Sequence, residues 1–432
     1  MMFDFLRGLI ITITIAVRSG NLMATTAFTP VSSICREAAK NPNGVQNFAS
    51  LFSSSPTILD GSFPSSTPAW YTDSNLSRSE IPITDEKSIE ESRFVFIQKG
   101  ERGTNHLYLE EVEHEGESSA SPLFLNFEQV EGILGKELSS NLVEKSDDGS
   151  LLLLWIGERS GVQYFAIYEP IENENTVSTC SAQLALKDTH PNLEPKLAPL
   201  REFGDRIPFS IDSAIHSTAN ALVEFHNSHR FCSYCGNATS IRKYGASRIC
   251  SDHKSTGGNC RSPSIYPRID LASIMLVTSP CDNYCLLGRK STWPKGRYST
   301  LAGFLEVGET IEHCCVRETF EESGVMIERD SVKFVRSQPW PFPRSLMAGF
   351  RARAARNGKE ENKNELPEIN VDEKEMEDVR WFHRDYVVQR LGGGSTALLY
   401  EPAEEEREFH IPGKASLARL LITEWALEKT TD

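Results

Sequence analysis

Three glutamates stand close together in the stretch GFLEVGETIEHCCVRETFEESGV, residues 303–325. Glu318, Glu321 and Glu322 are spaced i, i+3 and i+4, so a helix over this stretch places all three on one face. Like charges at this spacing repel each other, which favours a bound cation, and hard oxygen ligands select magnesium or manganese. Such a cation activates water and stabilises charge on a phosphoryl group. The glutamates therefore predict divalent-metal-dependent phosphoryl chemistry.

The spacing around these glutamates is more specific than the glutamates alone. It reads G-x5-E-x7-R-E-x2-E-E-x-G, from Gly303 to Gly324. This pattern is identified as a Nudix box, so the chain resembles the Nudix hydrolases, in which water attacks a nucleoside diphosphate linked to another group. The resemblance implies a catalytic set of Glu309, Arg317, Glu318, Glu321 and Glu322. Glu318 and Glu322 would be metal ligands, Glu321 would be a ligand or base, and Arg317 is expected to pair with Glu321 one turn on.

Four cysteines crowd into residues 232–260. Cys-x2-Cys is followed by fourteen residues, then by Cys250 and Cys260. Paired thiolates on two tight turns are the ligands of a tetrahedral structural zinc. The sequence predicts one Zn²⁺ per chain, bound by Cys232, Cys235, Cys250 and Cys260. Nine residues separate the last two cysteines, where about two to four are usual, so His253 is an alternative fourth ligand.

Basic side chains are frequent in the same segment. Residues 228–270 contain seven Lys or Arg but two Asp, whereas the whole chain has a formal net charge of −15. The overall charge argues against nonspecific binding of nucleic acid or anionic membranes by the whole surface. The local basic charge leaves two interpretations open: ordinary surface charge, or attraction of a polyphosphate or RNA substrate.

The stretch SQPWPFPRS, residues 337–345, alternates prolines with polar and aromatic residues. Proline excludes a helix interior or a central strand, and it stiffens a loop that must present such groups. A cysteine ribbon, Tyr-Pro-Arg, a Nudix box and this stretch succeed one another in the chain. This combination is similar to the NADH pyrophosphatase subfamily of the Nudix hydrolases, and the similarity covers residues 205–428.

This resemblance implies further site residues. The wall of a dinucleotide pocket would be formed by Gln338, Pro339, Trp340, Pro341, Phe342, Pro343, Arg344 and Ser345. Phe304 would stack on a base, and Tyr266 would supply the opposite stacking face from a dimer partner. The backbone carbonyl of Ala302 would bind Mg²⁺ or Mn²⁺, and the backbone of Ala418 would contact substrate. Glu375 matches a further metal-binding glutamate, with Glu373 and Glu377 as alternatives in register.

The expected function is hydrolysis of NADH or NAD to AMP and nicotinamide mononucleotide by a homodimer, without stable membrane insertion. Two alternatives stay open. The same site would remove an NAD cap from RNA, or the chain would be a noncatalytic nucleotide- or RNA-binding module. The second alternative is disfavoured because no carboxylate of the box is replaced.

The expected fold class is α/β, with an α/β/α sandwich around a mixed sheet that is preceded by a zinc ribbon and a β-rich N-terminal domain. A chain of 432 residues suggests two or three domains. The predicted order is a targeting or disordered segment at 1–90, the β-rich domain at 91–205, a helix plus zinc ribbon at 206–266 and the Nudix domain at 267–428. Short strands such as RFVFIQ and VQYFAIYEP indicate the β-rich part.

The N-terminal residues allow two interpretations. LIITITIAV, residues 9–17, is shorter than the roughly 20 residues of a membrane-spanning helix. Residues 5–36 contain Arg, Ser and Thr but no Asp or Glu, which suits a plastid or mitochondrial targeting sequence. Alternatively, translation starts at Met23 and the protein is cytoplasmic. The last three residues do not form a peroxisomal signal.

Overall fold

The computed structural model describes a defined part of the chain. The described residues are 10–18, 21–29, 76–78, 90–99, 105–114, 117–134, 152–169, 196–203, 207, 210–356, 366–391 and 409–428. The chain divides into two compact units, Met1–Ser65 and Ser66–Asp432. Most of the predicted segment 1–90 lies outside the described residues, so its targeting role stays a prediction.

The first unit contains one described element, an antiparallel strand pair. β1 (Ile10–Arg18) pairs with β2 (Asn21–Thr29), with Ile10 opposite Thr29. The alternation of Ile and Thr in ITITI is the pattern of a strand. This strand pair lies within residues 1–90, the segment expected to be targeting or disordered.

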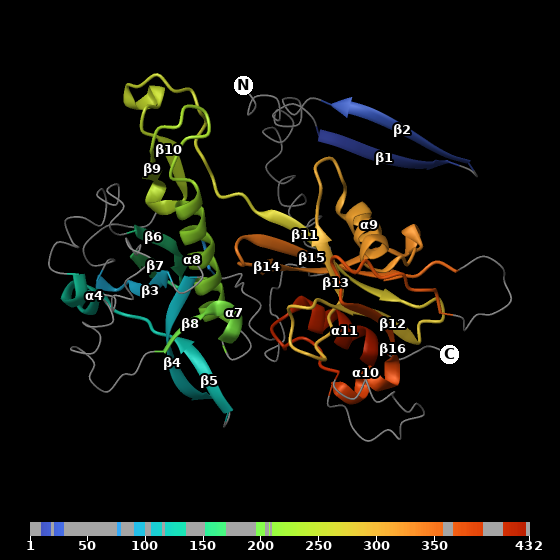
Figure 1. Cartoon of the computed structure of the whole chain (residues 1–432). Helices are drawn as coiled ribbons and strands as arrows, with labels where there is room; N and C mark the ends of the chain where they lie inside the picture. Colours follow the sequence, from blue (N-terminus) through green and yellow to red (C-terminus); the bar gives the residue numbers. More distant parts are fainter. Residues whose placement is uncertain are drawn as a thin grey trace. The chain divides into compact units, whose positions relative to one another are not determined.

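The second unit begins with a six-stranded sheet (Figure 1). Its order is β5 (Glu117–Pro122), β4 (Asn105–His114), β3 (Arg93–Lys99), β7 (Val162–Glu169) and β6 (Leu152–Arg159), and β8 (Lys196–Pro199) pairs with β4. Phe94 and Phe96 pack on one face with α4 (Phe127–Leu134), while Val95 and Ile97 pack on the other. The strand alternation in RFVFIQ thus separates two cores.

A long helix covers one of these two faces. α8 (Ser210–Ser228) buries Ile215, Ala219, Leu222 and Val223 in the core that contains Val95 and Ile97. It comes after the short α7 (Leu200–Phe203). α8 lies at the start of the segment 206–266, where a helix was expected before the ribbon.

The cysteine ribbon comes directly after α8 and is attached to it. β9 (Thr239–Arg242) and β10 (Ser247–Cys250) form an antiparallel pair. The guanidinium of Arg248 donates hydrogen bonds to the hydroxyl and the carbonyl of Thr239, both at 2.7 Å, and lies 3.0 Å from Nδ1 of His226 on α8. Burial lowers the pKa of His226 to about 4, so the imidazole is neutral and accepts this contact.

The C-terminal part of the second unit is built on a mixed sheet. Its order is β14 (Lys333–Trp340), β15 (Ser345–Arg353), β11 (Asp270–Thr278), β12 (Tyr284–Arg289) and β16 (Asp378–His383), and β13 (Leu301–Phe304) pairs with β11. β11 and β15 are parallel, and the other pairs are antiparallel.

Helices cover both faces of this sheet. In Figure 1, α9 (Ile311–Ser323) lies on one face, and α10 (Arg384–Arg390) and α11 (Leu417–Leu427) lie on the other. Met275 and Val277 pack in the core that contains Cys315 of α9, whereas Ile274 and Leu276 pack in the core with α11. The expected α/β/α sandwich around a mixed sheet is confirmed. No helix in the described ranges is long and apolar enough to cross a membrane.

The proline-rich stretch, residues 337–345, connects the C-terminal mixed sheet to the core that α8 covers. It begins on β14, which is an edge strand and therefore tolerates proline. The buried amide of Gln338 donates to the carbonyl of Ala415 at 2.7 Å and accepts from the N–H of Leu417 at 2.8 Å. Trp340 and Phe342 instead pack against the core that α8 covers. Asn220 of α8 donates a hydrogen bond to the carbonyl of Pro341.

Candidate active site

The glutamate-bearing helix begins and ends as its sequence indicates. The hydroxyl of Thr310 accepts a hydrogen bond from the N–H of His313 at 3.3 Å, which caps α9. Gly324 ends the helix with a φ of 71°. Glu318 and Glu322 are 8% and 1% exposed, and Glu321 faces solvent.

A third carboxylate joins the two buried ones. Oxygen atoms of Glu318, Glu322 and Glu375 all lie within 4.8 Å of one another. Glu375 comes from the segment that precedes β16, about 50 residues after the helix. Glu377 instead forms an ion pair with Arg289. The structure thus places Glu375 beside the helix glutamates, in the register favoured from the sequence.

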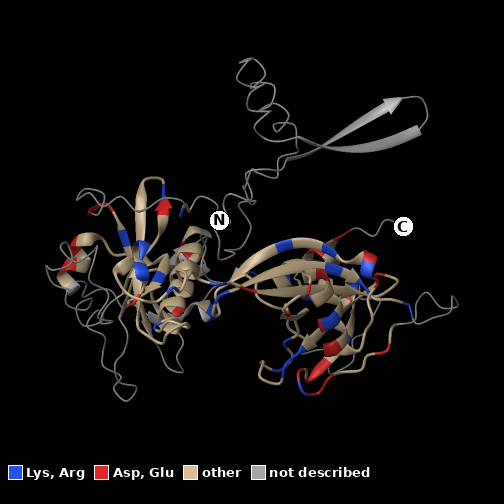
Figure 2. Ribbon diagram, turned by 90° about the horizontal axis from the view of Figure 1, so that it is seen from above, with Lys and Arg blue, Asp and Glu red and all other residues tan. Residues whose placement is uncertain are grey.

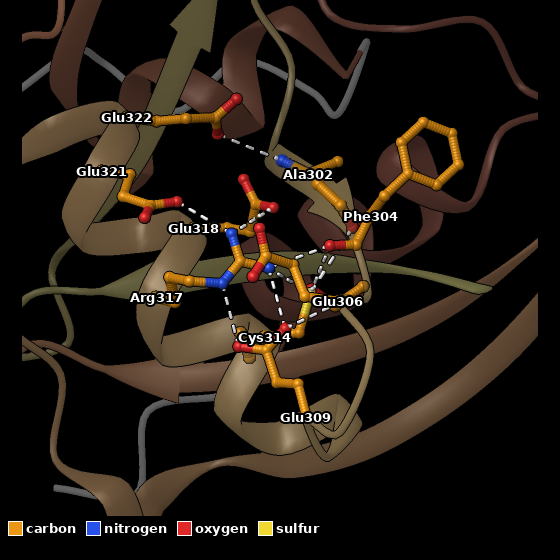
Figure 3. A network of polar contacts seen from close by, with 12 residues as sticks. Ala302, Phe304, Glu306, Glu309, Cys314, Arg317, Glu318, Glu321 and Glu322 are labelled. Atoms are coloured by element: carbon orange, nitrogen blue, oxygen red, sulfur yellow. Dashed lines mark hydrogen bonds and ion pairs between the residues drawn. The ribbon is translucent and has the colours of Figure 1, made fainter. Parts of the chain in front are cut away.

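One guanidinium organises the rest of the cluster (Figure 3). Arg317 donates hydrogen bonds of 2.8–2.9 Å to Glu309, Glu318 and Glu321 and to the carbonyl of Phe304. The expected pairing of Arg317 with Glu321 is therefore present. The hydrogen bond from Arg317 lowers the pKa of Glu309, and the same contacts raise the pKa of the arginine. Arg317 stays charged and positions carboxylates, so it is not a proton donor.

Glu322 lies in the least hydrated part of the cluster. Burial raises the pKa of its carboxyl to about 8, and the nearby charge of Glu318 adds to this effect. Nζ of Lys290 at 3.9 Å and the N–H of Ala302 at 3.3 Å from its oxygens favour the charged form. Oxygens packed this closely in a partly dry site suit a hard divalent cation. The residues present therefore fit the expected Mg²⁺ or Mn²⁺.

Lys290 was not among the predicted site residues. It lies one residue after β12, in the sequence LLGRK. No motif marks this position, and the only signal was a cation directly after a buried strand. Its ammonium group places positive charge beside the carboxylates, where a diphosphate would bind.

The first glycine of the Nudix box has a steric cause. Gly303 lies on β13, opposite Ser273 of β11, and the carboxyl group of Glu318 lies directly over it. A Cβ atom added at this position would overlap that carboxyl group. Glycine therefore allows the metal-binding side chain to approach the backbone next to Ala302.

The four cysteines form a second cluster. Their sulfur atoms lie within 4.8 Å of one another, with 3.4 Å between Cys235 and Cys250 and 3.9 Å between Cys232 and Cys260. Four sulfurs about 2.3 Å from a tetrahedral zinc are about 3.8 Å apart, so the cluster fits this ion. His253 is not in the cluster, and its Nδ1 accepts the N–H of Ser255 at 3.0 Å. The geometry favours Cys260 as the fourth ligand.

The predicted substrate-binding residues fall into three groups. Pro339, Trp340, Pro341, Arg344 and Ser345 line a cavity of about 330 Å³ whose other wall is α8. Gln338 is buried, and its side-chain amide is hydrogen-bonded to the backbone of Ala415 and Leu417. Phe342 and Pro343 do not line the cavity. Ala418 is buried in the first turn of α11.

The two predicted stacking residues are exposed. The Phe304 ring is 59% exposed and points away from the carboxylates in Figure 3, and Tyr266 is 52% exposed. They make no ring contact with each other in the described part of one chain. Their pairing across a dimer stays a prediction.

The cysteine geometry predicts one tightly bound zinc per chain. We expect Cys235→Ser to lose the metal and to precipitate or unfold, because a structural site contributes folding free energy. We expect His253→Ala to keep both metal and fold. Elemental analysis and circular dichroism measure the two outcomes. Loss of zinc from His253→Ala, with retention in Cys260→Ser, would show that the fourth ligand is the histidine.

The close approach at Gly303 predicts a selective defect in Gly303→Ala. The added methyl group displaces the flexible Glu318 carboxyl group, so the affinity for Mn²⁺ should fall by about 10- to 100-fold while the fold is retained. Calorimetric titration with Mn²⁺ measures this affinity. Gly132→Ala on α4, where the methyl group meets no atom within 4 Å, is the matched control. Equal Mn²⁺ affinity in wild type and Gly303→Ala would contradict the steric explanation.

The raised pKa of Glu322 predicts a pH dependence of stability in the absence of divalent metal. The folded state keeps a proton on Glu322 up to pH about 8, whereas the unfolded state releases it near pH 4.5. The free energy of unfolding should therefore fall as pH rises through this window. Melting temperatures of wild type and Glu322→Gln between pH 5 and 8 measure the effect, which the substitution should remove. Parallel pH profiles would show that Glu322 does not titrate in this range.

Comparison with known proteins agrees with this geometry. Residues 270–397 match the model of the NUDIX domain. Human NAD-capped RNA hydrolase NUDT12 is 35% identical over 242 residues, which are 55% of this chain and 46% of its own. NAD-capped RNA hydrolase of Schizosaccharomyces pombe is 36% identical over 227 residues, 51% of this chain and 56% of its own. The chain thus spans about half the length of these two relatives.

This chain covers a larger share of one bacterial relative. NAD-capped RNA hydrolase NudC of Mycobacterium bovis is 35% identical over 238 residues, which are 55% of this chain and 67% of its own. The matched domain includes β11, the whole Nudix box, Glu375 and β16. The chain belongs to the Nudix hydrolases, in the subfamily of the NADH pyrophosphatase type.

Proposed function

We propose that this chain hydrolyses the diphosphate bond of a nicotinamide adenine dinucleotide, yielding AMP and nicotinamide mononucleotide. The observation that carries the proposal is the complete carboxylate cluster. Glu318, Glu322 and Glu375 converge within 4.8 Å, and Arg317 holds Glu318 from the side. A module that only bound nucleotides would have no need of this arrangement, which concentrates negative charge where a diphosphate must bind.

The reaction is a hydrolysis in which one phosphorus–oxygen bond forms and one breaks. Glu318, Glu322, Glu375 and the carbonyl of Ala302 would hold a divalent cation, which would offset the charge of the diphosphate and lower the pKa of a nearby water. Water attacks one phosphorus atom, the bridging oxygen leaves with the other nucleotide, and the proton of the water passes to a carboxylate. Glu321 suits this last role, because it is 50% exposed and only one of its oxygens is bound by Arg317.

The remaining residues position the ends of the dinucleotide. The exposed ring of Phe304 comes at the end of the metal-binding strand, so a base that stacks on it lies beside the diphosphate. Tyr266 of a second copy would cover the other face of that base, which is why we propose a homodimer. The cavity lined by Trp340 and Arg344 offers apolar surface and positive charge for another part of the substrate. We propose that the cysteine cluster holds a structural zinc.

A second substrate is NAD that caps an RNA chain. The three relatives compared above are named NAD-capped RNA hydrolases, and the scissile diphosphate is the same in both substrates. The carboxylate cluster performs the same step on either. The two substrates differ in whether an RNA chain is attached to the adenosine. Residues that select between free dinucleotide and capped RNA must therefore lie outside the metal-binding residues.

The proposal predicts AMP and reduced nicotinamide mononucleotide from NADH with Mg²⁺ or Mn²⁺, identified by mass spectrometry. NAD and an NAD-capped RNA are assayed in parallel. Glu322→Gln should lower kcat by orders of magnitude, because the missing charge removes stabilisation of the transition state. Glu312→Gln, an exposed glutamate on the same helix, is the control and should keep the wild-type rate. Absence of hydrolysis products from all three substrates with folded, metal-loaded protein would refute the proposal.

A further inference from the structure

The cysteine ribbon exposes two large aromatic side chains. Phe231 is 68% exposed and Tyr234 is 71% exposed. Both lie in the knuckle sequence FCSYC, so a metal at Cys232 and Cys235 would fix the backbone that carries them. Exposed aromatics on a rigid knuckle are available for stacking, because little freedom remains to be lost on binding.

The strand register defines which side chains share the outer face of the ribbon. Phe231 lies opposite Ala238, Arg242 lies opposite Ser247, and Arg248 lies opposite Ile265. Because side chains alternate along a strand, Phe231, Arg242 and Tyr266 point to one side. Arg248 points to the other side, where it contacts His226 of α8. Phe231, Arg242 and Tyr266 therefore face away from α8.

We call Phe231, Tyr234, Arg242, Lys243 and Tyr266 the outer ribbon face. Nζ of Lys243 lies 6.0 Å from the centroid of the Tyr266 ring, which is a cation–π distance. Three spacings between adjacent strands and about four residues along the strands separate Phe231 from Tyr266, a distance on the order of 20 Å. This length is enough for several nucleotides of an extended single strand.

Positive charge accompanies these aromatics. Asp252 is the only acidic residue between positions 228 and 269, although the chain as a whole carries a formal charge of −15. Figure 2 marks the positions of Lys and Arg in blue and of Asp and Glu in red. Within the part of the chain that the structure describes, no carboxylate forms an ion pair with the exposed cations of the ribbon. These are Arg230, Arg242, Lys243, Lys254, Arg261 and Arg268.

We propose that the outer ribbon face binds the single-stranded RNA attached to an NAD cap. This inference rests on the proposed function, because it assigns a substrate class to the same reaction. Unpaired bases stack on aromatic rings, while Lys and Arg neutralise the backbone phosphates. A membrane surface or an acidic peptide would use the cations but would not need two exposed rings on the knuckle. Tyr266, expected to stack on the dinucleotide bound by a second copy, lies on the same face and would bring this surface beside the cap site of that copy.

The test uses the full-length, zinc-loaded protein. The variants are Phe231→Ala/Tyr234→Ala and Arg242→Gln/Lys243→Gln, and neither pair belongs to the catalytic machinery. Phe334→Ala, 60% exposed on β14, and Arg329→Ala, exposed before β14, are the aromatic and charge controls. Two quantities are measured: kcat/KM for NADH and for an NAD-capped 20-nucleotide RNA, and affinity by fluorescence anisotropy for the same RNA with a 5′-hydroxyl.

The expected result is a defect restricted to RNA. Removing the two aromatics should weaken RNA binding about 5-fold or more and lower kcat/KM for capped RNA through KM. Removing the two cations should reduce the slope of log K against log salt by about 0.7 for each lost phosphate contact. Turnover of NADH should stay at the wild-type value in both variants and in both controls.

Three results would overturn the inference. The first is wild-type affinity for RNA in both double variants, and the second is an equal loss in Phe334→Ala and Arg329→Ala. The third is binding that depends on the cations but not on the rings, which would indicate a polyanion or acidic partner instead. A wild-type protein that cleaves neither NADH nor capped RNA would refute the proposed function, while the anisotropy measurement would still decide whether the ribbon binds RNA.

Discussion

The C-terminal half of this chain is arranged around one electrostatic constraint: carboxylates that must stay close together in a partly dry site. Glu322 is almost fully buried and has Glu318 and Glu375 within a few ångströms. Such a group is stable only with positive charge beside it or with a proton bound. Positive charge or a donor group comes from Arg317, Lys290 and the N–H of Ala302. Gly303 has no side chain, which leaves space for the Glu318 carboxyl group. The caps of α9 fix the helix to which the glutamates belong.

The carboxylate cluster and the cysteine cluster have opposite chemical characters. The carboxylates present hard oxygens beside an open surface with Phe304 and Glu321, which leaves space for a substrate. The cysteines present four soft sulfurs, and three of the four residues are buried, which suits an ion that keeps no open position. The carboxylate cluster is therefore open to solvent on one side, whereas the cysteine cluster is largely enclosed.

Much of the site was predictable because it is local in the sequence. The Nudix box lies within 22 residues, so its helix, its caps and the common face of Glu318 and Glu322 could be inferred from spacing alone. Glu375 required the resemblance to a family, because about 50 residues separate it from the helix. The mixed sheet was also inferred from the family. Spacing carried no information about Lys290, since its position depends on how β12 lies against α9.

Contacts between distant segments were the least predictable. Trp340 and Phe342 were expected in the wall of a pocket, and Trp340 does line a cavity. Nothing local indicated that both rings also pack on the core of the N-terminal sheet, because that core comes from residues more than 110 positions earlier. The strand pair near the N-terminus was missed for another reason, since the alternation in ITITI lies inside a segment of otherwise irregular composition.

The proline-rich stretch has a consequence for the independence of the catalytic half. Its Gln338 amide holds the start of α11, while its two aromatic rings are inserted in a core that belongs to the N-terminal sheet and α8. In a fragment that begins at residue 267, those two rings would be exposed to water. The end of β14 that contacts α11 would also be less constrained. The N-terminal sheet and α8 therefore supply packing surface for two aromatic rings of the Nudix half.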